Sequence, residues 1–203
     1  MMKKIFYKHY VFLAEINNFI KENLVKFNNI NIIIDIDEKD KKRLEKQLSI
    51  IKFAKKNNIP FLFKNDFRKC IKFNASGIFI EANYKKITKP MLLKKNFHII
   101  GGAHNQLEYT QKLRQKCHLL MLSPLFFNEK YSKNKILNIS KFNQKALNWK
   151  IKLCALGGIN SKTLKKIKLT KCIAIGFKKF IFDTQIKKPA YAFSVGRFNK
   201  FKF

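Results

Sequence analysis

Cysteine pairs, acidic residues and long apolar runs are scarce in this sequence, and each shortage excludes a class of protein. The 4 cysteines have no Cys-x-x-Cys spacing and lie in apolar segments. This pattern argues against a zinc site and favours buried free thiols in a reducing compartment. No apolar run approaches the roughly 18 residues of a membrane-spanning helix, and no signal-peptide cleavage site follows the first residues. We therefore expect a cytoplasmic protein without a membrane partner.

Acidic residues number 12 against 44 Lys and Arg, so the formal net charge is +32. Glycine, proline and arginine are also few, whereas Lys, Asn, Ile and Phe are abundant, as expected when an AT-rich coding bias fills neutral surface positions. A nucleic-acid-binding protein is the alternative, since this charge attracts polyanions. The basic residues are spread along the chain without a known nucleic-acid motif. We expect no specific nucleic acid partner; the charge also suits an anionic small substrate.

Hydrophobic residues make up 46% and aromatic residues 14% of the 203 residues, which is enough apolar material for a folded core. Short apolar runs typical of buried parallel strands alternate with longer amphipathic segments typical of helices. The predicted strands are 9–14, 30–36, 60–64, 77–82, 97–101, 118–123, 151–157 and 172–177. The predicted helices are 16–27, 39–57, 66–73, 105–116, 139–148 and 160–169, with a helical turn at 88–95.

Eight strand–helix units in about 200 residues favour a small, single-domain (β/α)8 TIM barrel of the α/β class over a doubly wound sheet. We expect the barrel to span residues 1–182 and a basic, aromatic tail to span residues 183–203. Asn105 and Asn160 directly follow predicted strands and are expected to cap the next helices. In such a barrel, functional residues lie at the carboxyl ends of the strands.

Glycines gather at these predicted strand ends, although the chain has only 7 of them. Gly101 and Gly102 end the fifth strand, Gly157 and Gly158 end the seventh, and Gly176 closes the eighth. A glycine pair lets backbone N–H groups approach an anion, and a following helix adds a favourable dipole. The last two strand ends therefore match the phosphate site of such barrels. A plain tight turn is the alternative interpretation.

Two titratable residues also follow predicted strands. Asp66 comes after the third strand, where a carboxylate can bind a hard cation such as Mg²⁺ or cap the next helix. The local sequence supports both roles equally. His104 follows the fifth strand and is a candidate general acid–base group, although a lone histidine is more often structural.

Four segments, taken in order, resemble the thiamine phosphate synthase/TenI family. The segment IPFLFKNDFRKCIKFNASGIFIEA (59–82) is similar to the family's strand ending in Asn-Asp, its short helix and its next strand. IIGGAHNQLEYTQK (99–112) resembles the "GxSAH" strand end, and LMLSPLFF (120–127) resembles the "GPIF" strand end. LCALGGINSKTLKKI (153–167) resembles the family's phosphate turn. The resemblance covers residues 59–182 and implies a (β/α)8 barrel.

The resemblance implies an enzyme of thiamine biosynthesis, with thiamine phosphate synthase as the leading function. That enzyme joins hydroxymethylpyrimidine pyrophosphate to a thiazole phosphate with Mg²⁺ and releases pyrophosphate. A TenI-like thiazole tautomerase, which moves a proton with a histidine and needs no metal, is the second possibility. A non-catalytic barrel that binds a phosphorylated ligand is the third.

The resemblance also implies roles for individual residues. It implies that Asn65 binds the pyrophosphate and that Asp66 binds the metal ion. It makes His104 and Lys39 catalytic candidates. The implied substrate- and phosphate-binding residues are Asn65, Gly102, Lys133, Gly157, Gly158, Ile175 and Gly176.

Several positions depart from the family pattern, among them Gly102 in place of a serine and residues 127–130 in place of a loop with two threonines. Asp35 and Asp37 stand where the family has Gln and Arg, which inverts the charge, and Tyr84 stands where a second metal carboxylate is expected. The phosphate end of the site is therefore better kept than the pyrophosphate end. This favours a tautomerase or a divergent synthase over a standard synthase.

Overall fold

The computed structural model describes residues 8–27, 29–36, 39–86, 96–127, 132 and 135–178. Within them, parallel strands pair in chain order and close on themselves, since β8 pairs with β1. The strands are β1 Lys8–Leu13, β2 Ile30–Ile34, β3 Phe61–Lys64, β4 Gly77–Ile80, β5 His98–Ala103, β6 Leu119–Leu122, β7 Lys152–Ala155 and β8 Ala174–Phe177. This confirms the predicted (β/α)8 barrel, because a doubly wound sheet leaves its edge strands apart.

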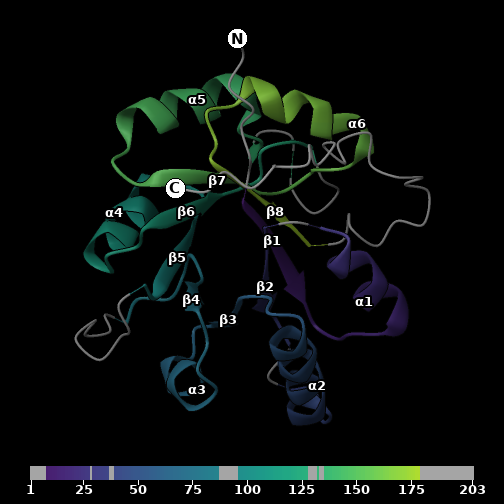
Figure 1. Ribbon diagram of the computed structural model, residues 1–203. Coiled ribbons are helices and arrows are strands. Elements are labelled where there is room, and N and C mark those ends of the chain that lie inside the picture. Colours follow the sequence, from purple (N-terminus) through teal and green to yellow (C-terminus); the bar gives the residue numbers. More distant parts are fainter. Residues whose placement is uncertain are drawn as a thin grey trace, which may run out of the picture.

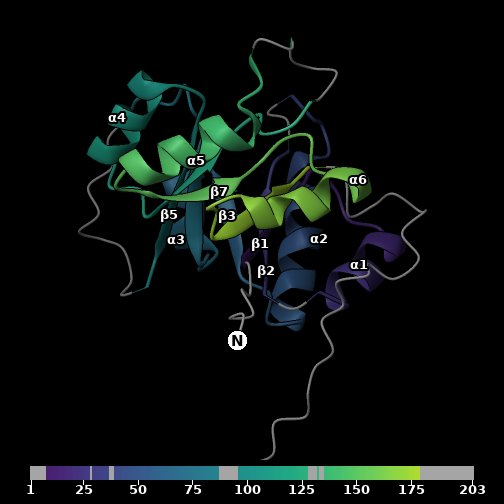
Figure 2. The same ribbon diagram turned by 90° about the horizontal axis from the view of Figure 1, so that it is seen from above.

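The helices lie around the outside of the barrel (Figure 1). They are α1 Asn18–Val25, α2 Arg43–Lys56, α3 Phe67–Lys72, α4 Gln106–Arg114, α5 Asn138–Asn148 and α6 Ser161–Leu164, which continues as the 3₁₀ helix η3 Lys165–Leu169. In both views α4 and α5 are neighbours (Figure 2), and the rings of Tyr109 and Trp149 stack there at 4.2 Å. The predicted helical turn at 88–95 and tail at 183–203 lie outside the described residues.

Side-chain caps fix where several helices begin. Asn105 Oδ1 accepts the backbone N–H of Glu108 at 3.0 Å, and Asn160 Oδ1 accepts those of Lys162 and Thr163 at 3.0 and 3.1 Å. Both caps were predicted, and both satisfy N–H groups that a helix leaves unpaired at its start. The helices that follow β5 and β7 therefore start directly at the carboxyl ends of these strands.

Alternating side chains build two apolar cores. One fills the barrel interior and includes Phe12, Ile33, Leu62 and Phe79. The other lies between the strands and the helices and takes the intervening residues, such as Phe63. This two-residue period decides which residues of a strand can reach the mouth of the barrel.

The cysteines behave as small core residues, as predicted. Cys70, Cys117, Cys154 and Cys172 are all buried and free. Burial raises the pKa of the Cys70 and Cys117 thiols to about 12, which keeps them protonated at neutral pH. Among the described segments, no helix is long and apolar enough to cross a membrane.

Gly77 at the start of β4 gives a test of strand packing. A Cβ atom there would press against the backbone carbonyl oxygen of His98 in β5, whereas one at Gly102 would have Phe79 Cζ as its nearest neighbour, at 3.3 Å. We expect Gly77→Ala to lower the free energy of unfolding by about 1–3 kcal/mol and Gly102→Ala to lower it less. Urea unfolding followed by the fluorescence of Trp149, the single tryptophan, measures both. Equal losses would contradict this packing.

Candidate functional site

A charged layer lies on top of the interior core at the carboxyl ends of β2, β3 and β4. Each of its residues stands two positions beyond an interior apolar residue of its strand. The pairs are Ile33 and Asp35, Leu62 and Lys64, and Phe79 and Glu81. Because the side chains of a strand alternate, all three positions continue the inward register. Beneath them, the rings of Phe12 and Phe79 meet edge to face at 5.1 Å.

Four charged residues connect across this mouth, and we call them the mouth cluster. Lys64 Nζ lies 2.5 Å from Asp35 Oδ1 and 3.4 Å from Glu81 Oε1. Lys178, which follows β8, places its Nζ 3.7 Å from Asp35 Oδ2 and 4.9 Å from the ring centre of Phe12. The mouth cluster thus spans the rim from β8 to β4 and pairs two cations with two carboxylates.

The charge state of Lys64 follows from two opposing effects. Burial by itself would lower the pKa of Lys64, but the hydrogen bond and charge of Asp35 and the charge of Glu81 outweigh it, so the pKa is raised above its ordinary value. Lys64 is therefore an ammonium ion at neutral pH. Its side chain is 26% exposed, so a ligand can reach it.

The predicted pair Asn65 and Asp66 is held firmly beside Lys64. Asn65 takes a left-handed backbone (φ 55°). Its Nδ2 donates to Glu81 Oε2 at 2.8 Å, and its Oδ1 accepts the backbone N–H of Glu81 at 2.9 Å. Asp66 Oδ1 accepts the backbone N–H of Lys69 at 2.9 Å and so caps α3. The structure thus confirms the capping role that the sequence left open for Asp66.

These residues line one open pocket of about 680 Å³. Its walls come from the strand ends of β2 to β4 and from α2, with Arg43 and Lys69 adding positive charge and Tyr84 an aromatic side chain. The sequence-predicted Asn65 and Asp66 are therefore brought together with Lys64 and Glu81 in a cavity of the size of a small-molecule site.

The donors in this pocket do not fit a magnesium site. In the described part of the chain, no three His, Cys, Asp or Glu side chains gather as metal ligands. Asp66 caps α3, and its Oδ2 lies 3.5 Å from Lys69 Nζ. Asp35 and Glu81 are engaged with Lys64, and position 84 carries a tyrosine. These carboxylates are therefore occupied by lysines and by the helix cap, and they do not form a ligand set for Mg²⁺.

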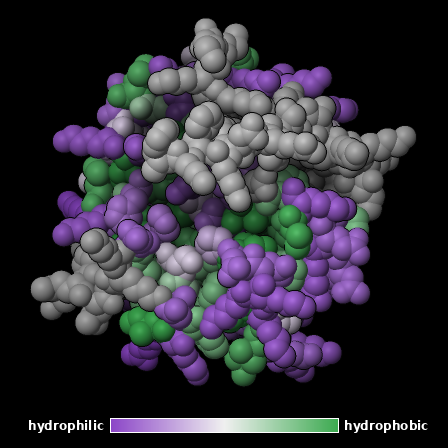
Figure 3. All heavy atoms as spheres, in the orientation of Figure 1, coloured by the Kyte–Doolittle hydropathy of each residue, from purple (hydrophilic) through white to green (hydrophobic). Residues whose placement is uncertain are grey.

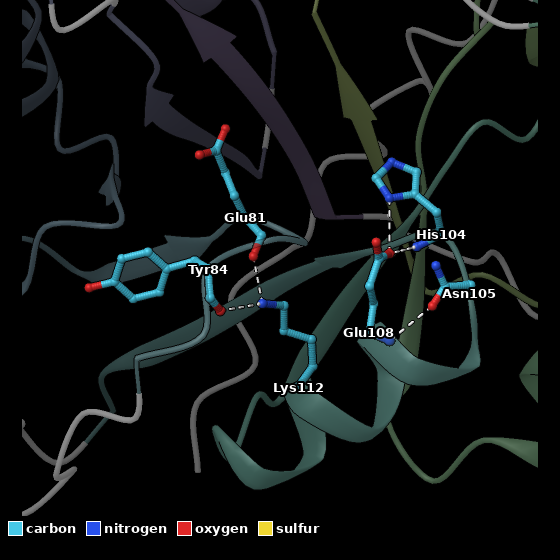
Figure 4. Close-up of polar contacts among 6 residues, drawn as sticks. All are labelled: Glu81, Tyr84, His104, Asn105, Glu108 and Lys112. Atoms are coloured by element: carbon cyan, nitrogen blue, oxygen red, sulfur yellow. Dashed lines mark hydrogen bonds and ion pairs between the residues drawn. The ribbon is translucent and has the colours of Figure 1, made fainter.

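His104 forms a pair with Glu108 just after β5. Its Nδ1 lies 3.0 Å from Glu108 Oε2, and the same oxygen accepts the backbone N–H of His104 (Figure 4). In the tautomer whose Nδ1–H donates a hydrogen bond to Glu108, Nε2 carries no proton and is the basic nitrogen. The His104 side chain is 41% exposed. This arrangement suits a group that takes up and returns a proton.

A buried lysine on α4 fixes the wall of the pocket. Lys112 is fully buried, and its Nζ donates to the carbonyl oxygens of Glu81 and Tyr84 at 2.5 and 3.3 Å and to Gln115 Oε1 at 2.9 Å. Figure 4 shows the carboxylate of Glu81 pointing away from Lys112, toward the mouth. Gly101 leaves room for this lysine, since a Cβ there would lie 2.9 Å from Lys112 Cγ and Cδ.

The glycine turn after β7 has the backbone that only glycine adopts easily. Gly157 and Gly158 have φ values of 88° and 68°, and a Cβ at Gly158 would collide with the carbonyl oxygen of Phe126. Gly176 is buried in β8, where a Cβ would lie 2.9 Å from Leu156 Cδ1. The turn is thus formed as predicted at the carboxyl end of β7, and its phosphate-binding role stays a prediction.

The remaining candidates lie away from the pocket or outside the described residues. Ile175 faces the helices within the outer core, so only its backbone could serve a ligand. Lys39 is exposed in the connection between β2 and α2 and does not line the pocket. Gly102 lies buried in β5 near Phe79. Lys133 and Asp37 are outside the described residues.

Sequence reasoning missed Lys64, Lys178, Lys112 and Glu108. The first two carry a readable signal in the two-residue register of their strands. Lys64 stands two residues beyond interior Leu62 of β3, and Lys178 stands four residues beyond interior Ala174 of β8. Glu108 is four residues after His104 on a helical segment, a spacing that brings side chains together. Lys112 gave no signal, since a lysine on an amphipathic helix is normally exposed.

Removing the buried ammonium tests the role of Lys112. We expect Lys112→Met to lower the free energy of unfolding by about 1–3 kcal/mol, because the carbonyl oxygens of Glu81 and Tyr84 lose a buried donor. Burial lowers the pKa of Lys112 below its ordinary 10.5, so the unfolded chain binds more protons than the folded one just below that pH. This group therefore adds stability as the pH rises.

The pH dependence gives the control for this prediction. The stability difference between the wild-type protein and Lys112→Met, measured by urea unfolding, should grow as the pH rises toward the ordinary lysine pKa of 10.5. The titration of the many exposed lysines is common to both proteins and cancels. A difference that is constant or shrinks with pH would contradict the lowered pKa of the buried Lys112.

Comparisons with known proteins agree with this geometry. A family model described as thiamine monophosphate synthase matches residues 16–177. The thiamine phosphate pyrophosphorylase of Pyrococcus furiosus superposes with a TM-score of 0.65 at 13% identity, covering 84% of this chain and 85% of that one. KGPDC of Streptococcus mutans superposes with a TM-score of 0.55 at 9% identity, covering 85% of this chain and 87% of that one.

Identities this low show the fold alone, and no curated protein matched the sequence. The family match spans most of the chain, and the protein belongs to the thiamine monophosphate synthase/TenI family.

Proposed function

We propose that this protein is an enzyme of thiamine biosynthesis that joins hydroxymethylpyrimidine pyrophosphate to a thiazole phosphate and releases pyrophosphate. One observation carries the proposal: the Asn65–Asp66 pocket and the Gly157–Gly158 turn both form at the carboxyl end of the barrel. Two separate anion-binding regions at one mouth are what two phosphorylated substrates require. The family match over residues 16–177 supports this choice of substrates.

The chain's own residues have distinct tasks in this reaction. Departure of pyrophosphate leaves a pyrimidine-methyl cation, which the thiazole nitrogen captures. Negative charge grows on the leaving oxygens, and preorganised cationic donors such as Lys64 and Lys69 stabilise it. Asn65, fixed by Glu81, orients the pyrophosphate end. The glycine turn holds the thiazole phosphate through backbone N–H groups, and the apolar floor of Phe12 and Phe79 excludes water.

Asparagines with the same backbone conformation provide a controlled test. Asn65 (φ 55°) and Asn58 (φ 51°) are both left-handed, but Asn58 is exposed in the turn before β3, at the other end of the barrel. We expect Asn65→Gly to lower kcat/KM with both precursors by at least about tenfold, because the pyrophosphate loses its orienting amide. Asn58→Gly should retain wild-type activity. Equal effects of the two, or no thiamine phosphate from the wild type, would refute the proposal.

The same assay run with and without Mg²⁺ tests whether the reaction needs the metal ion that the family resemblance implies. Asp66→Asn keeps an amide oxygen that can cap α3 but removes the negative charge. Activity that needs both Mg²⁺ and Asp66 would assign this residue a metal-binding role beyond capping. Activity that needs neither would leave capping as its role.

A thiazole tautomerase is the second candidate, and the His104–Glu108 pair favours it. In this reaction His104 Nε2 takes a proton from the thiazole carboxylate phosphate and returns it elsewhere on the ring, while Glu108 stabilises the imidazolium. We expect Glu108→Gln to lower the tautomerase rate by about 10- to 100-fold. An unchanged rate would contradict a role for the His104–Glu108 pair in moving the proton. Failure of both assays with retained ligand binding would leave a non-catalytic barrel.

A further inference from the structure

The mouth cluster holds the Lys64 ammonium of β3 between carboxylates that follow β2 and β4, the strands on either side of it. Lys64 Nζ contacts Asp35 at 2.5 Å and Glu81 at 3.4 Å, and Glu81 is itself held by two hydrogen bonds to Asn65. Lys64 also lines the open pocket. An ion bound by carboxylates on one side and open to a ligand on the other is the usual arrangement of a divalent cation that binds phosphate oxygens.

We propose that the Lys64 ammonium takes the place of a divalent cation in this protein and binds the pyrophosphate end of the ligand, so that pyrophosphate binds without Mg²⁺. The proposal rests on the proposed function for the identity of the ligand. The position of the cation comes from the contacts of the mouth cluster alone.

The charges of the mouth cluster support this substitution. Mg²⁺ between two carboxylates carries a total charge of zero. Lys64 between Asp35 and Glu81 leaves one negative charge, and Lys178, 3.7 Å from Asp35, restores the total to zero. Two ammonium groups therefore supply the charge of one divalent ion at the same strand ends.

The hydrogen-bonding capacity of Lys64 also fits. An ammonium group has three N–H donors, and the contacts to Asp35 and Glu81 use two of them. The third N–H can donate to a phosphate oxygen. It would play the part of an open coordination position on a metal ion, which binds such an oxygen. Arg43 and Lys69 on the pocket wall add charge for the rest of a pyrophosphate.

The same contacts explain the inverted charge at Asp35. Asp35 stands where the family resemblance predicts a glutamine, and by itself it would repel pyrophosphate. Here both of its oxygens are near lysines, Oδ1 at 2.5 Å and Oδ2 at 3.7 Å. The two ammonium groups thus compensate the charge of Asp35, and Asp35 in turn holds them in position.

Binding of inorganic pyrophosphate, measured by isothermal titration calorimetry on the full chain, tests the proposal. The wild type is titrated in excess chelator and in excess Mg²⁺ at about physiological salt, to limit nonspecific attraction. We expect the two dissociation constants to agree within about twofold and Lys64→Met to weaken binding at least about tenfold. Lys55→Met, which removes one exposed lysine on α2, controls for net charge and should bind within about twofold of wild type.

The outcomes separate this inference from the proposed function. Pyrophosphate binding that needs Mg²⁺, equal losses in the two lysine variants, or no binding at all would overturn the role of Lys64. The chelator comparison uses the wild type, so it decides the metal question even if Lys64→Met does not fold. Chelator-resistant, Lys64-dependent binding without turnover would uphold the inference and refute the synthase. Turnover that strictly needs Mg²⁺ would uphold the synthase and refute the inference that Lys64 replaces the metal ion.

Discussion

Closing parallel strands into a barrel forces every second side chain of each strand into one shared interior. In this protein that space is filled by Phe12, Ile33, Leu62, Phe79 and their neighbours. The interior register does not stop where the apolar residues end. It continues two positions further along β2, β3 and β4. The inward residues at these positions therefore lie over the apolar interior and contact each other. The mouth cluster is the direct result of that geometry.

Charges placed there have to be paired, because they are partly removed from water and rest on aromatic rings. In the mouth cluster, lysines and carboxylates alternate around the rim, so that each charge lies next to an opposite one. The outer wall of the pocket depends on a buried lysine, Lys112, which holds the backbone after β4 by donating to two carbonyl oxygens. Gly101 makes this possible by leaving space for the lysine stem. Core packing and pocket shape are therefore set by the same few contacts.

The surface of the chain has a different character. Hydrophilic side chains are spread widely over the face shown in Figure 3, as expected if much of the positive charge is a solvated exterior. A high net charge by itself then says little about the ligand. What distinguishes Lys64 from the other lysines that line the pocket is its place between two carboxylates.

Local patterns in the sequence determined the strands, the helices, the caps at Asn105 and Asn160 and the buried cysteines. Each depends on residues close together in the chain, on alternation, helical spacing or a single capping side chain. The same patterns placed Asn65, Asp66, His104 and the Gly157–Gly158 turn at strand ends.

Only the tertiary structure decided which side chains meet across strands. The pairing of Lys64 with Asp35 and Glu81, the contact of Lys178 with Asp35 and the burial of Lys112 join residues far apart in sequence. Their positions depend on barrel closure and on the register between strands, which no local pattern encodes. The physical reason is that an ion pair is fixed by distance in space, and the closed barrel alone sets that distance.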